Sequence, residues 1–339
     1  MWRFAMDKFT EHMAQQDHYI AQTYLKHFAD TDGRLHTYQK PNGKYFSAWP
    51  GDVCREWDDD LNPDIPDRPE LLGDFRKMFE PHWNAVVEEL KERRMAKDRK
   101  MVVSLCYAHM MICVPTWRRL LARFWEQTKA IELRFRNTTY KERGIKDEQL
   151  EKGIALIENG AIRLEAEPNS VKAWLTINLV KFACQAYHAD WKIVENNGDI
   201  PFFTSDNPVA VQYGATPAEP TTKFMPITPK LGLLMITDPR KEHGRIIHKP
   251  HEEIERLLKE EPSGSIQSVV PLPQTVKNLN RLVAKCAESL VFSSRKEDGG
   301  ARLFKKYGKY RIESDFPVQR QPDGSLIAGI IMRVRPRTD

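Results

Sequence analysis

Apolar residues recur at helical spacing near the start of the chain. This pattern predicts a first helix over residues 7–29, with a break near residues 15–17 as one option. The apolar positions of this segment are Phe9, Met13, Ile20, Tyr24, Leu25 and Phe28. Asp17 is a residue type that favours the N-cap, so a helix beginning at His18 is expected.

An alternating pattern follows at residues 34–39, with Leu35, Thr37 and Gln39 on one side and Arg34, His36 and Tyr38 on the other. The turn sequence Pro-Asn-Gly at 41–43 separates this segment from a second short run at 44–49. Two such runs joined by a turn predict an N-terminal β-hairpin.

Helical periodicity dominates the middle of the chain. It predicts helices over residues 70–90, 101–136, 147–159 and 170–188. Pro115 is expected to kink the second of these helices internally, and Gly160 is expected to stop the third.

The pattern changes to short β-type runs after residue 190. Strands are predicted at residues 191–195, 202–204, 209–213 and 232–237, with short helices at 251–259 and 275–289. A closing hairpin is expected around residues 322–325. The predicted fold class is therefore α+β, with a mainly helical middle packed against a mixed or antiparallel sheet and a hairpin at each end. We expect residues 1–339 to form a single domain.

The composition is that of an ordinary soluble globular protein. Hydrophobic residues make up 41% and charged residues 29% of the 339 positions. The most apolar segment, 101–114, is too short to cross a bilayer, and the first residues lack the apolar core of a secretory signal. Five scattered cysteines without a CxxC pair suit a reducing compartment. We expect a cytoplasmic protein with no membrane partner.

Charge is distributed unevenly, although the formal net charge is only +5. Acidic residues outnumber basic ones over residues 52–80, whereas basic residues prevail over 91–136 and from 301 to the end. Such a polarised surface can concentrate partners that carry phosphate groups. The alternative interpretation is that these runs are solvated helix faces.

Two segments far apart in the chain place polar side chains among apolar ones. Residues 18–28 read His-Tyr-Ile-Ala-Gln-Thr-Tyr-Leu-Lys-His-Phe, and residues 202–209 read Phe-Phe-Thr-Ser-Asp-Asn-Pro-Val. They resemble the His-Tyr-Ile-Pro-x-x-Tyr-Leu-x-x-Phe and Phe-x-Thr-Ser-Asp-Asn-Pro-Val elements of an uncharacterised family, domain of unknown function four-two-three-eight. The resemblance covers about residues 17–295 and leaves 296–339 as a basic C-terminal extension. Ala21 departs from it, because the family usually has proline there.

The first segment supplies candidate catalytic residues. On a helix, His18, Gln22 and Lys26 would share one face and present a titratable base, an amide and an amine. Tyr24 is a further catalytic candidate, and Lys26 a candidate for substrate binding. The alternative is a buried or capping histidine in the first helical turn.

The second segment supplies a carboxylate. Asp206 follows a predicted strand and could act with His18 or bind a metal, and Ser205 and Asn207 could contact a substrate. In the alternative interpretation, Asp206 and Asn207 form an Asx-type turn that satisfies their own backbone. We expect the two segments to face one pocket.

Three more residues are candidates by residue type. Glu80 could be a second metal ligand beside Asp206, although an exposed structural glutamate is the simpler interpretation. Arg118 and Arg119 could bind phosphate, because a guanidinium matches its bidentate geometry. Their alternative role is that of solvated helix arginines.

The sequence lacks a P-loop, a dinucleotide-binding glycine motif and an HExxH helix. The remaining hypothesis is a metal-dependent nuclease, with Mg²⁺ or Mn²⁺ as the cofactor and RNA or DNA as the substrate. The resemblance implies no activity, but relatives in bacteria and phage-related regions suggest a toxin or defence role with a cognate antitoxin or defence-system protein. The alternative is a non-catalytic sensor of a nucleotide, nucleic acid or protein. An enzyme acting on small metabolites is a third option.

Overall fold

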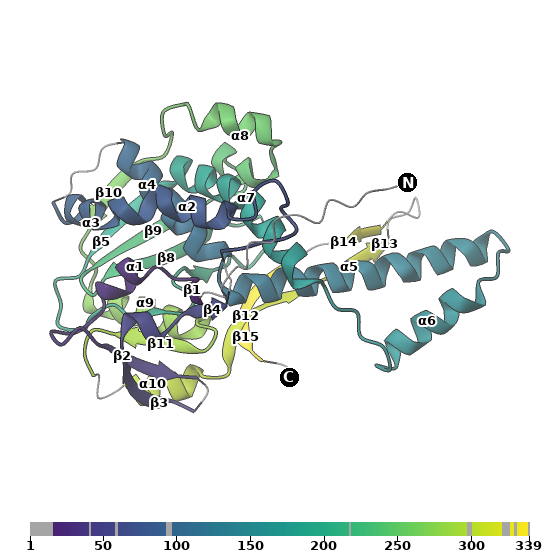
Figure 1. Ribbon diagram of the computed structural model, residues 1–339, viewed down its shortest axis with the longest axis horizontal. Helices are drawn as coiled ribbons and strands as arrows, with labels where there is room; N and C mark the ends of the chain where they lie inside the picture. The colour runs from purple at the N-terminus through teal and green to yellow at the C-terminus, as the bar shows by residue number, and fades with distance from the viewer. Residues whose placement is uncertain are drawn as a thin grey trace, which may run out of the picture.

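The computed structural model describes residues 16–40, 42–57, 60–92, 97–216, 218–296, 300–320, 326–328 and 331–337. The predicted α+β class is confirmed, because helices and mixed sheets share a body from which a two-helix arm projects (Figure 1). Most buried apolar residues between Tyr19 and Ile312 form one core cluster, and a second, smaller cluster consists of Cys184, Ile246, Ile254 and Leu257.

The larger sheet has five strands. In spatial order they are β10 (Ile266–Val269), β5 (Asp190–Glu195), β9 (Leu231–Thr237), β8 (Thr221–Thr228) and β7 (Ala210–Gln212). All neighbours are antiparallel except β10 and β5. Strand β8 was not predicted, and its ladder with β9 is irregular between Pro226 and Thr228, where proline cannot donate a ladder hydrogen bond.

The smaller sheet joins distant parts of the chain. Its strands are, in order, β3 (Lys44–Ala48), β2 (Leu35–Gln39), β11 (Leu290–Ser293) and β6 (Thr204–Ser205). Strands β2 and β3 form the predicted N-terminal hairpin. Because β11 pairs with β6, the segment around Asp206 lies beside residues 288–290.

Helices surround the sheets. They are α2 (Leu71–Phe79), α3 (Trp83–Lys91), α4 (Lys97–Ile112), α5 (Pro115–Glu142), α6 (Glu148–Glu158), α7 (Pro168–His188), α8 (His251–Leu257), α9 (Pro273–Cys286) and α10 (Gly300–Tyr307), with 3₁₀ turns η1 (Pro50–Asp52), η2 (Glu80–His82) and η3 (Glu242–His248). Helices α4 and α7 pack together, and α9 contacts both β7 and β6, so α9 links the two sheets.

Two predicted helices are interrupted by proline. The predicted internal kink at Pro115 is wrong: Pro115 is the first residue of α5, where its fixed φ and missing N–H cost nothing, and α4 ends before it. Likewise Pro81 lies in η2, between α2 and α3. Helices α6 and α7 agree with the predictions, and Gly160 follows α6 with a φ of 76°.

The predicted first helix is wrong where the structure describes it. Residues 7–15 lie outside the described part, Gln16–His18 form strand β1, and only Gln22–Lys26 form a helix, α1. Strand β1 pairs with β4 (Arg55–Trp57), and the Tyr19 N–H donates to the Cys54 carbonyl at 3.0 Å. Asp17 is therefore not an N-cap, and its carboxylate accepts from the Asp60 N–H at 3.1 Å. Pairing with a distant strand overrides the local helical spacing.

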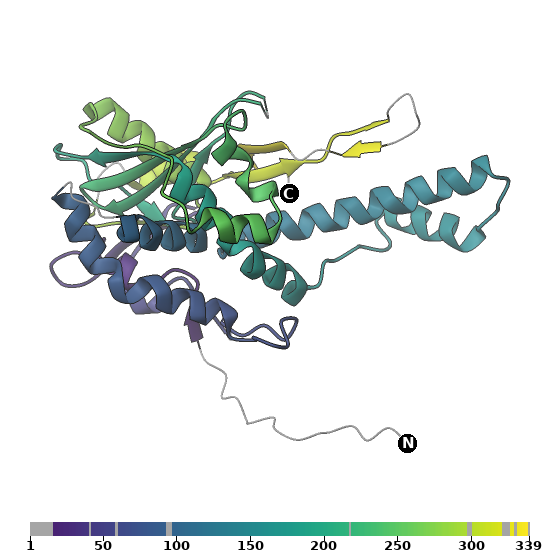
Figure 2. The ribbon, with the colours of Figure 1, turned by 90° about the horizontal axis from the view of Figure 1, so that it is seen from above.

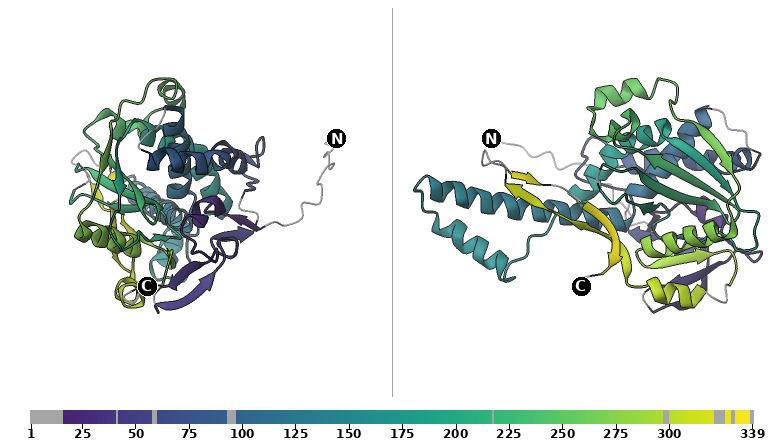
Figure 3. Two further views of the ribbon diagram at one scale, coloured as in Figure 1. Left: turned by 90° about the vertical axis from the view of Figure 1, so that its left-hand side faces the viewer. Right: turned by 180° about the vertical axis from the view of Figure 1, so that it is seen from behind.

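The arm and the C-terminal tail extend in the same direction. Figure 2 shows α5 and α6 projecting beyond the sheets, and Figure 3 shows the ribbon of the tail running out on the same side. The tail strands are β12 (Tyr310–Asp315), β13 (Val318–Arg320), β14 (Leu326–Ala328) and β15 (Ile331–Pro336). The predicted closing turn at 322–325 lies outside the described residues, but β13 and β14 pair on either side of it.

No helix in the described ranges is long and apolar enough to span a bilayer.

Candidate functional site

His18 lies at the end of β1, partly buried beside the turn that contains Gly51. Its Nε2 atom is 3.1 Å from the Gly51 carbonyl oxygen, and the Gln22 amide donates to its Nδ1 atom at 3.4 Å. This arrangement requires the neutral tautomer with hydrogen on Nε2. Burial lowers the pKa of His18, which also favours the neutral ring. His18 and Gln22 therefore meet, although not on one helix face.

Lys26, the third member of the predicted face, lies at the end of α1 with its side chain exposed. It borders a surface hollow of about 510 Å³ with His27, Asn84 and Glu88. The structure places Lys26 in this hollow and does not join it to the hydrogen bonds of His18.

Tyr24 connects the two sequence segments. Its hydroxyl donates to the Pro226 carbonyl at 2.6 Å and accepts from the Thr204 hydroxyl at 2.7 Å. Tyr24 is 1% exposed, and burial raises the pKa of its hydroxyl above the ordinary range. The two segments thus pack together, with Tyr24 as a neutral structural link.

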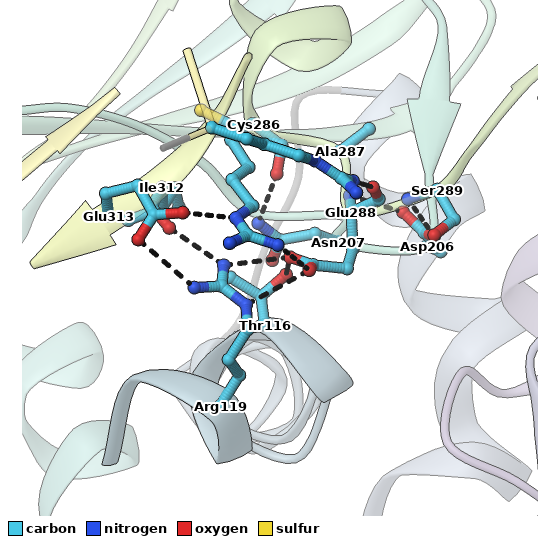
Figure 4. A network of polar contacts seen from close by, with 12 residues as sticks. Thr116, Arg119, Asp206, Asn207, Cys286, Ala287, Glu288, Ser289, Ile312 and Glu313 are labelled. Carbon is cyan, nitrogen blue, oxygen red and sulfur yellow. Dashed lines mark hydrogen bonds and ion pairs between the residues drawn. The ribbon is translucent and has the colours of Figure 1, made fainter. Parts of the chain in front are cut away.

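Asp206 holds the loop that precedes β11. Its carboxylate accepts backbone N–H bonds from Glu288, Ser289 and Leu290 at 2.9, 2.6 and 2.8 Å (Figure 4). Burial raises the pKa of Asp206 to about 6, against the opposing effects of these N–H groups and of Lys40. Asp206 also contributes to the raised pKa of Tyr19, the residue after His18. The carboxylate and the imidazole therefore lie in neighbouring segments but have separate hydrogen-bond partners.

Ser205 and Asn207 form the turn around this carboxylate. The Ser205 hydroxyl donates to the Asn207 carbonyl at 2.8 Å and accepts from the Asn207 N–H at 3.2 Å. The Asn207 amide donates to the Cys286 carbonyl at 2.9 Å. Both residues are fully buried. The Ser205 hydroxyl satisfies local backbone groups, but the side chains of Asp206 and Asn207 bind backbone groups far along the chain. The predicted Asx-type turn, in which Asp206 and Asn207 satisfy their own backbone, is therefore not what the structure shows.

Both candidate arginines make ion pairs. Arg118 pairs with Glu56 at 2.5 Å and donates to the Cys113 carbonyl at 2.8 Å. Arg119 forms a bidentate pair with Glu288, at 3.1 and 3.0 Å, and donates to the Ile312 carbonyl at 2.8 Å (Figure 4). Their guanidinium groups are thus used to join α5 to other parts of the fold.

No contact in the described residues supports the metal role predicted for Asp206 and Glu80. Glu80 lies in η2, where burial raises its pKa and Arg76 opposes that shift. The oxygens of Asp206 already accept three backbone N–H bonds. Within the described ranges, no group of three His, Cys, Asp or Glu side chains converges. The metal role of Asp206 and Glu80 therefore stays a prediction.

A cavity larger than the hollow beside Lys26 lies elsewhere, where the arm joins the body. It has a volume of about 700 Å³ and lies between α5, α7, the β7–β9 part of the larger sheet, η3 and β15. Its aromatic walls are Trp117, Phe124, Trp125, Trp174, Phe182 and Tyr213. The sequence predicted a helix over residues 170–188 but not that its side chains border a cavity. Trp174, on this helix, is 42% exposed, so the helix is not fully covered by other elements.

Polar groups enter this cavity from two elements. Lys223 of β8 and Gln185 of α7 lie together, with the ammonium 3.3 Å from the amide oxygen, while Lys181 lies on α7. Lys223 is only 8% exposed, and burial lowers its pKa to about 8. The arrangement provides aromatic surfaces for stacking and a buried cation for an acidic group.

The described geometry can be compared with known proteins. Comparisons with curated proteins and with solved structures gave no match. The family model described as "Protein of unknown function (DUF4238)" matches residues 16–297, which include both polar segments and most of the cavity walls. The chain therefore belongs to this family, DUF4238, as its sequence motifs predicted.

Proposed function

We propose that this chain is a binding module that holds a small aromatic molecule in the cavity at the base of the arm. It shares the non-catalytic character of the alternative drawn from the sequence, although that alternative placed the ligand in a pocket between the His18 and Asp206 segments. The observation that carries it is the set of six aromatic side chains around one cavity of about 700 Å³. Ligand sites typically have volumes of about 300–1,000 Å³ and mostly apolar walls with a few polar groups.

A nucleotide is the ligand class to test first. Its base can stack on tryptophan or tyrosine, and stacking of a base on an aromatic side chain contributes about 1–3 kcal/mol. The amides of Gln185 and Asn178 border the same space and can pair with polar edges of a base. An aromatic ring with polar substituents thus matches both the walls and the polar groups.

The nuclease hypothesis has less support from the geometry. It needs Asp206 as a metal ligand or as a partner of His18, whereas the Asp206 carboxylate accepts three backbone N–H bonds. The predicted phosphate-binding residue Arg119 is paired with Glu288. The nuclease activity, the Mg²⁺ or Mn²⁺ requirement and a nucleic-acid substrate stay predictions. The defence role, a cognate antitoxin and a cytoplasmic location also stay predictions.

Binding can be tested by filling the cavity. N-phenyl-1-naphthylamine is an uncharged aromatic probe whose fluorescence rises in apolar surroundings, so its titration reports occupancy. Asn178→Trp places a large ring at a half-buried wall position, and we expect at least a tenfold loss of probe affinity. Ile177→Trp is the matched control, since Ile177 is 43% exposed and does not line the cavity.

Two results would contradict the proposal. One is absence of probe binding to the wild-type protein, and the other is equal binding to the two tryptophan variants.

If the probe binds as expected, competition by nucleosides and nucleotides would identify the ligand class. Displacement by none of them, with the probe still bound, would remove the nucleotide assignment but retain the cavity as a binding site.

A further inference from the structure

Three buried lysines each carry an ammonium group that has lost much of its hydration. Burial lowers the pKa of Lys40, Lys100 and Lys223 to about 8 in each case. An ammonium group has three N–H donors and loses its hydration when buried, so each donor needs an acceptor. The three lysines differ in how far the protein supplies these acceptors.

Lys40 and Lys100 are provided with backbone acceptors. The Lys40 ammonium donates to the carbonyls of Ala284, Ala287 and Tyr310 at 2.8, 2.6 and 2.8 Å. The Lys100 ammonium donates to two carbonyls at 3.2 Å and lies 4.9 Å from the ring centre of Trp191. Both lysines therefore have structural roles that explain their burial.

Lys223 lacks such a set of acceptors. Its hydrogen bond to the Gln185 amide oxygen is long, at 3.3 Å, and the Tyr107 ring centre is 6.0 Å away. Among the described residues, no carboxylate forms an ion pair with Lys223, and burial alone lowers its pKa. Glu219, the acidic residue of the cavity wall, is exposed and accepts from the Ala215 N–H at 2.8 Å. Unlike the other two lysines, Lys223 borders the aromatic cavity.

We propose that the ligand of this cavity carries an oxyanion, which binds the Lys223 ammonium while the aromatic part of the ligand packs between α5 and α7. This inference rests on the proposed binding function and names the ligand class as aromatic anions. A carboxylate, sulfonate or phosphate oxygen supplies the acceptor that the protein lacks at this position. Such charge-assisted hydrogen bonds are about twice as strong as neutral ones.

A pair of matched probes separates this inference from simple occupancy. 8-Anilino-1-naphthalenesulfonate has the aromatic framework of N-phenyl-1-naphthylamine plus one sulfonate group. Lys223→Met is expected to weaken binding of the sulfonate probe at least tenfold and to change the affinity of the uncharged probe less than twofold. Lys152→Met removes an exposed cation on α6, outside the cavity, and is expected to leave both affinities unchanged.

The wild-type protein provides a second measurement that needs no variant. Deprotonation of Lys223 above pH 8 should weaken sulfonate binding about tenfold per pH unit, while binding of the uncharged probe stays constant. Adenosine and adenosine monophosphate, used as competitors, form a second pair that tests phosphate in place of sulfonate. Tighter binding of the monophosphate would assign a nucleotide, and equal binding would favour carboxylates or sulfonates.

The two proposals fail differently. If the uncharged probe binds but the sulfonate probe loses no affinity in Lys223→Met and shows no pH dependence, the oxyanion is refuted and the cavity remains a ligand site. If neither probe binds the wild-type protein, the binding function itself fails. An equal loss of sulfonate binding in Lys152→Met would show that the sulfonate binds non-specific surface charge, and this also refutes the inference.

Discussion

Replacement of Lys223 by methionine should stabilise the protein. The lysine has a pKa of about 8 in the folded chain, against 10.5 for an ordinary lysine. At pH 7 this difference costs the folded state about 3 kcal/mol, since each pKa unit corresponds to about 1.4 kcal/mol. Methionine has a similar length and no charge, so the variant removes this cost. Loss of the long bond to Gln185 offsets about 1 kcal/mol, which leaves a net gain of about 2 kcal/mol.

The stabilisation by Lys223→Met should depend on pH. Between pH 8 and 10.5 the unfolded chain keeps the Lys223 proton and the folded chain has lost it, so the stability of the wild type rises with pH in this window. The gain from Lys223→Met should therefore be fully present below pH 8 and lost by about pH 10.5. Other lysines titrate in both proteins and cancel in the comparison.

Urea unfolding at pH 7, 8, 9 and 10 measures this difference directly. A destabilised variant at pH 7, or a difference that stays constant across the series, would refute the account of Lys223 as a desolvated cation without a protein counterion. A stabilised variant that has lost sulfonate binding would show that Lys223 lowers stability in return for ligand affinity.

Other predictions concern the two sequence segments. Asp206→Ala leaves three partly buried N–H donors without their carboxylate acceptor and should lower the free energy of unfolding by about 3 kcal/mol; a loss under 1 kcal/mol in urea unfolding would contradict the role of Asp206 in the 288–290 loop. Ala21→Pro should preserve or raise the melting temperature, because Ala21 already has a φ of −54°, and a marked drop would contradict this backbone reading. Labelled RNA or DNA with Mg²⁺ or Mn²⁺ should remain uncut; cleavage that disappears in His18→Ala would restore the nuclease hypothesis.

Periodicity predicted the elements whose contacts are local. Helices α6 and α7 and the β2–β3 hairpin follow from spacing and turn residues. The segment around His18 could not be predicted in this way, because β1 is formed by pairing with β4, which lies 37 residues away at the His18–Arg55 pair. Its apolar residues fit a helix as well as a buried strand and turn, and only tertiary contacts decide between them.

The motifs located a cluster of polar residues but not its role. Asp206, Ser205 and Asn207 are polar and close together, which is typical of both catalytic sites and buried turns. The difference lies in the partners, and the N–H groups that bind Asp206 come from a loop more than 80 residues later in the chain. Hydrogen-bond partners at this separation are not visible in one sequence.

A signal for the cavity was present in β8. Lys223, Met225 and Ile227 are two residues apart in β8, so strand periodicity places them on the same face. Because Met225 and Ile227 are fully buried, this face is apolar. A cation at such a position either finds buried acceptors or borders a space that a ligand can enter. The sequence cannot show which, because the walls come from α5, α7 and the tail, and their approach depends on the whole fold.

The tail completes one wall of the cavity and would therefore affect ligand selectivity in the proposed binding function. Ser314 of β12 and Met332 of β15 line the cavity, and both lie beyond residue 297, where the family match ends. Arg119 and Arg123 of α5 form ion pairs with Glu313 of β12, and β12 pairs with β15. Helix α5, which supplies three of the aromatic residues, is thus joined by ion pairs to β12, and β12 is paired with β15 in the same cavity wall. The aromatic walls and Lys223 lie within the family match, whereas the extension shapes the remaining wall. We therefore expect substitutions in the extension of this chain to change which ligand outlines the cavity accepts.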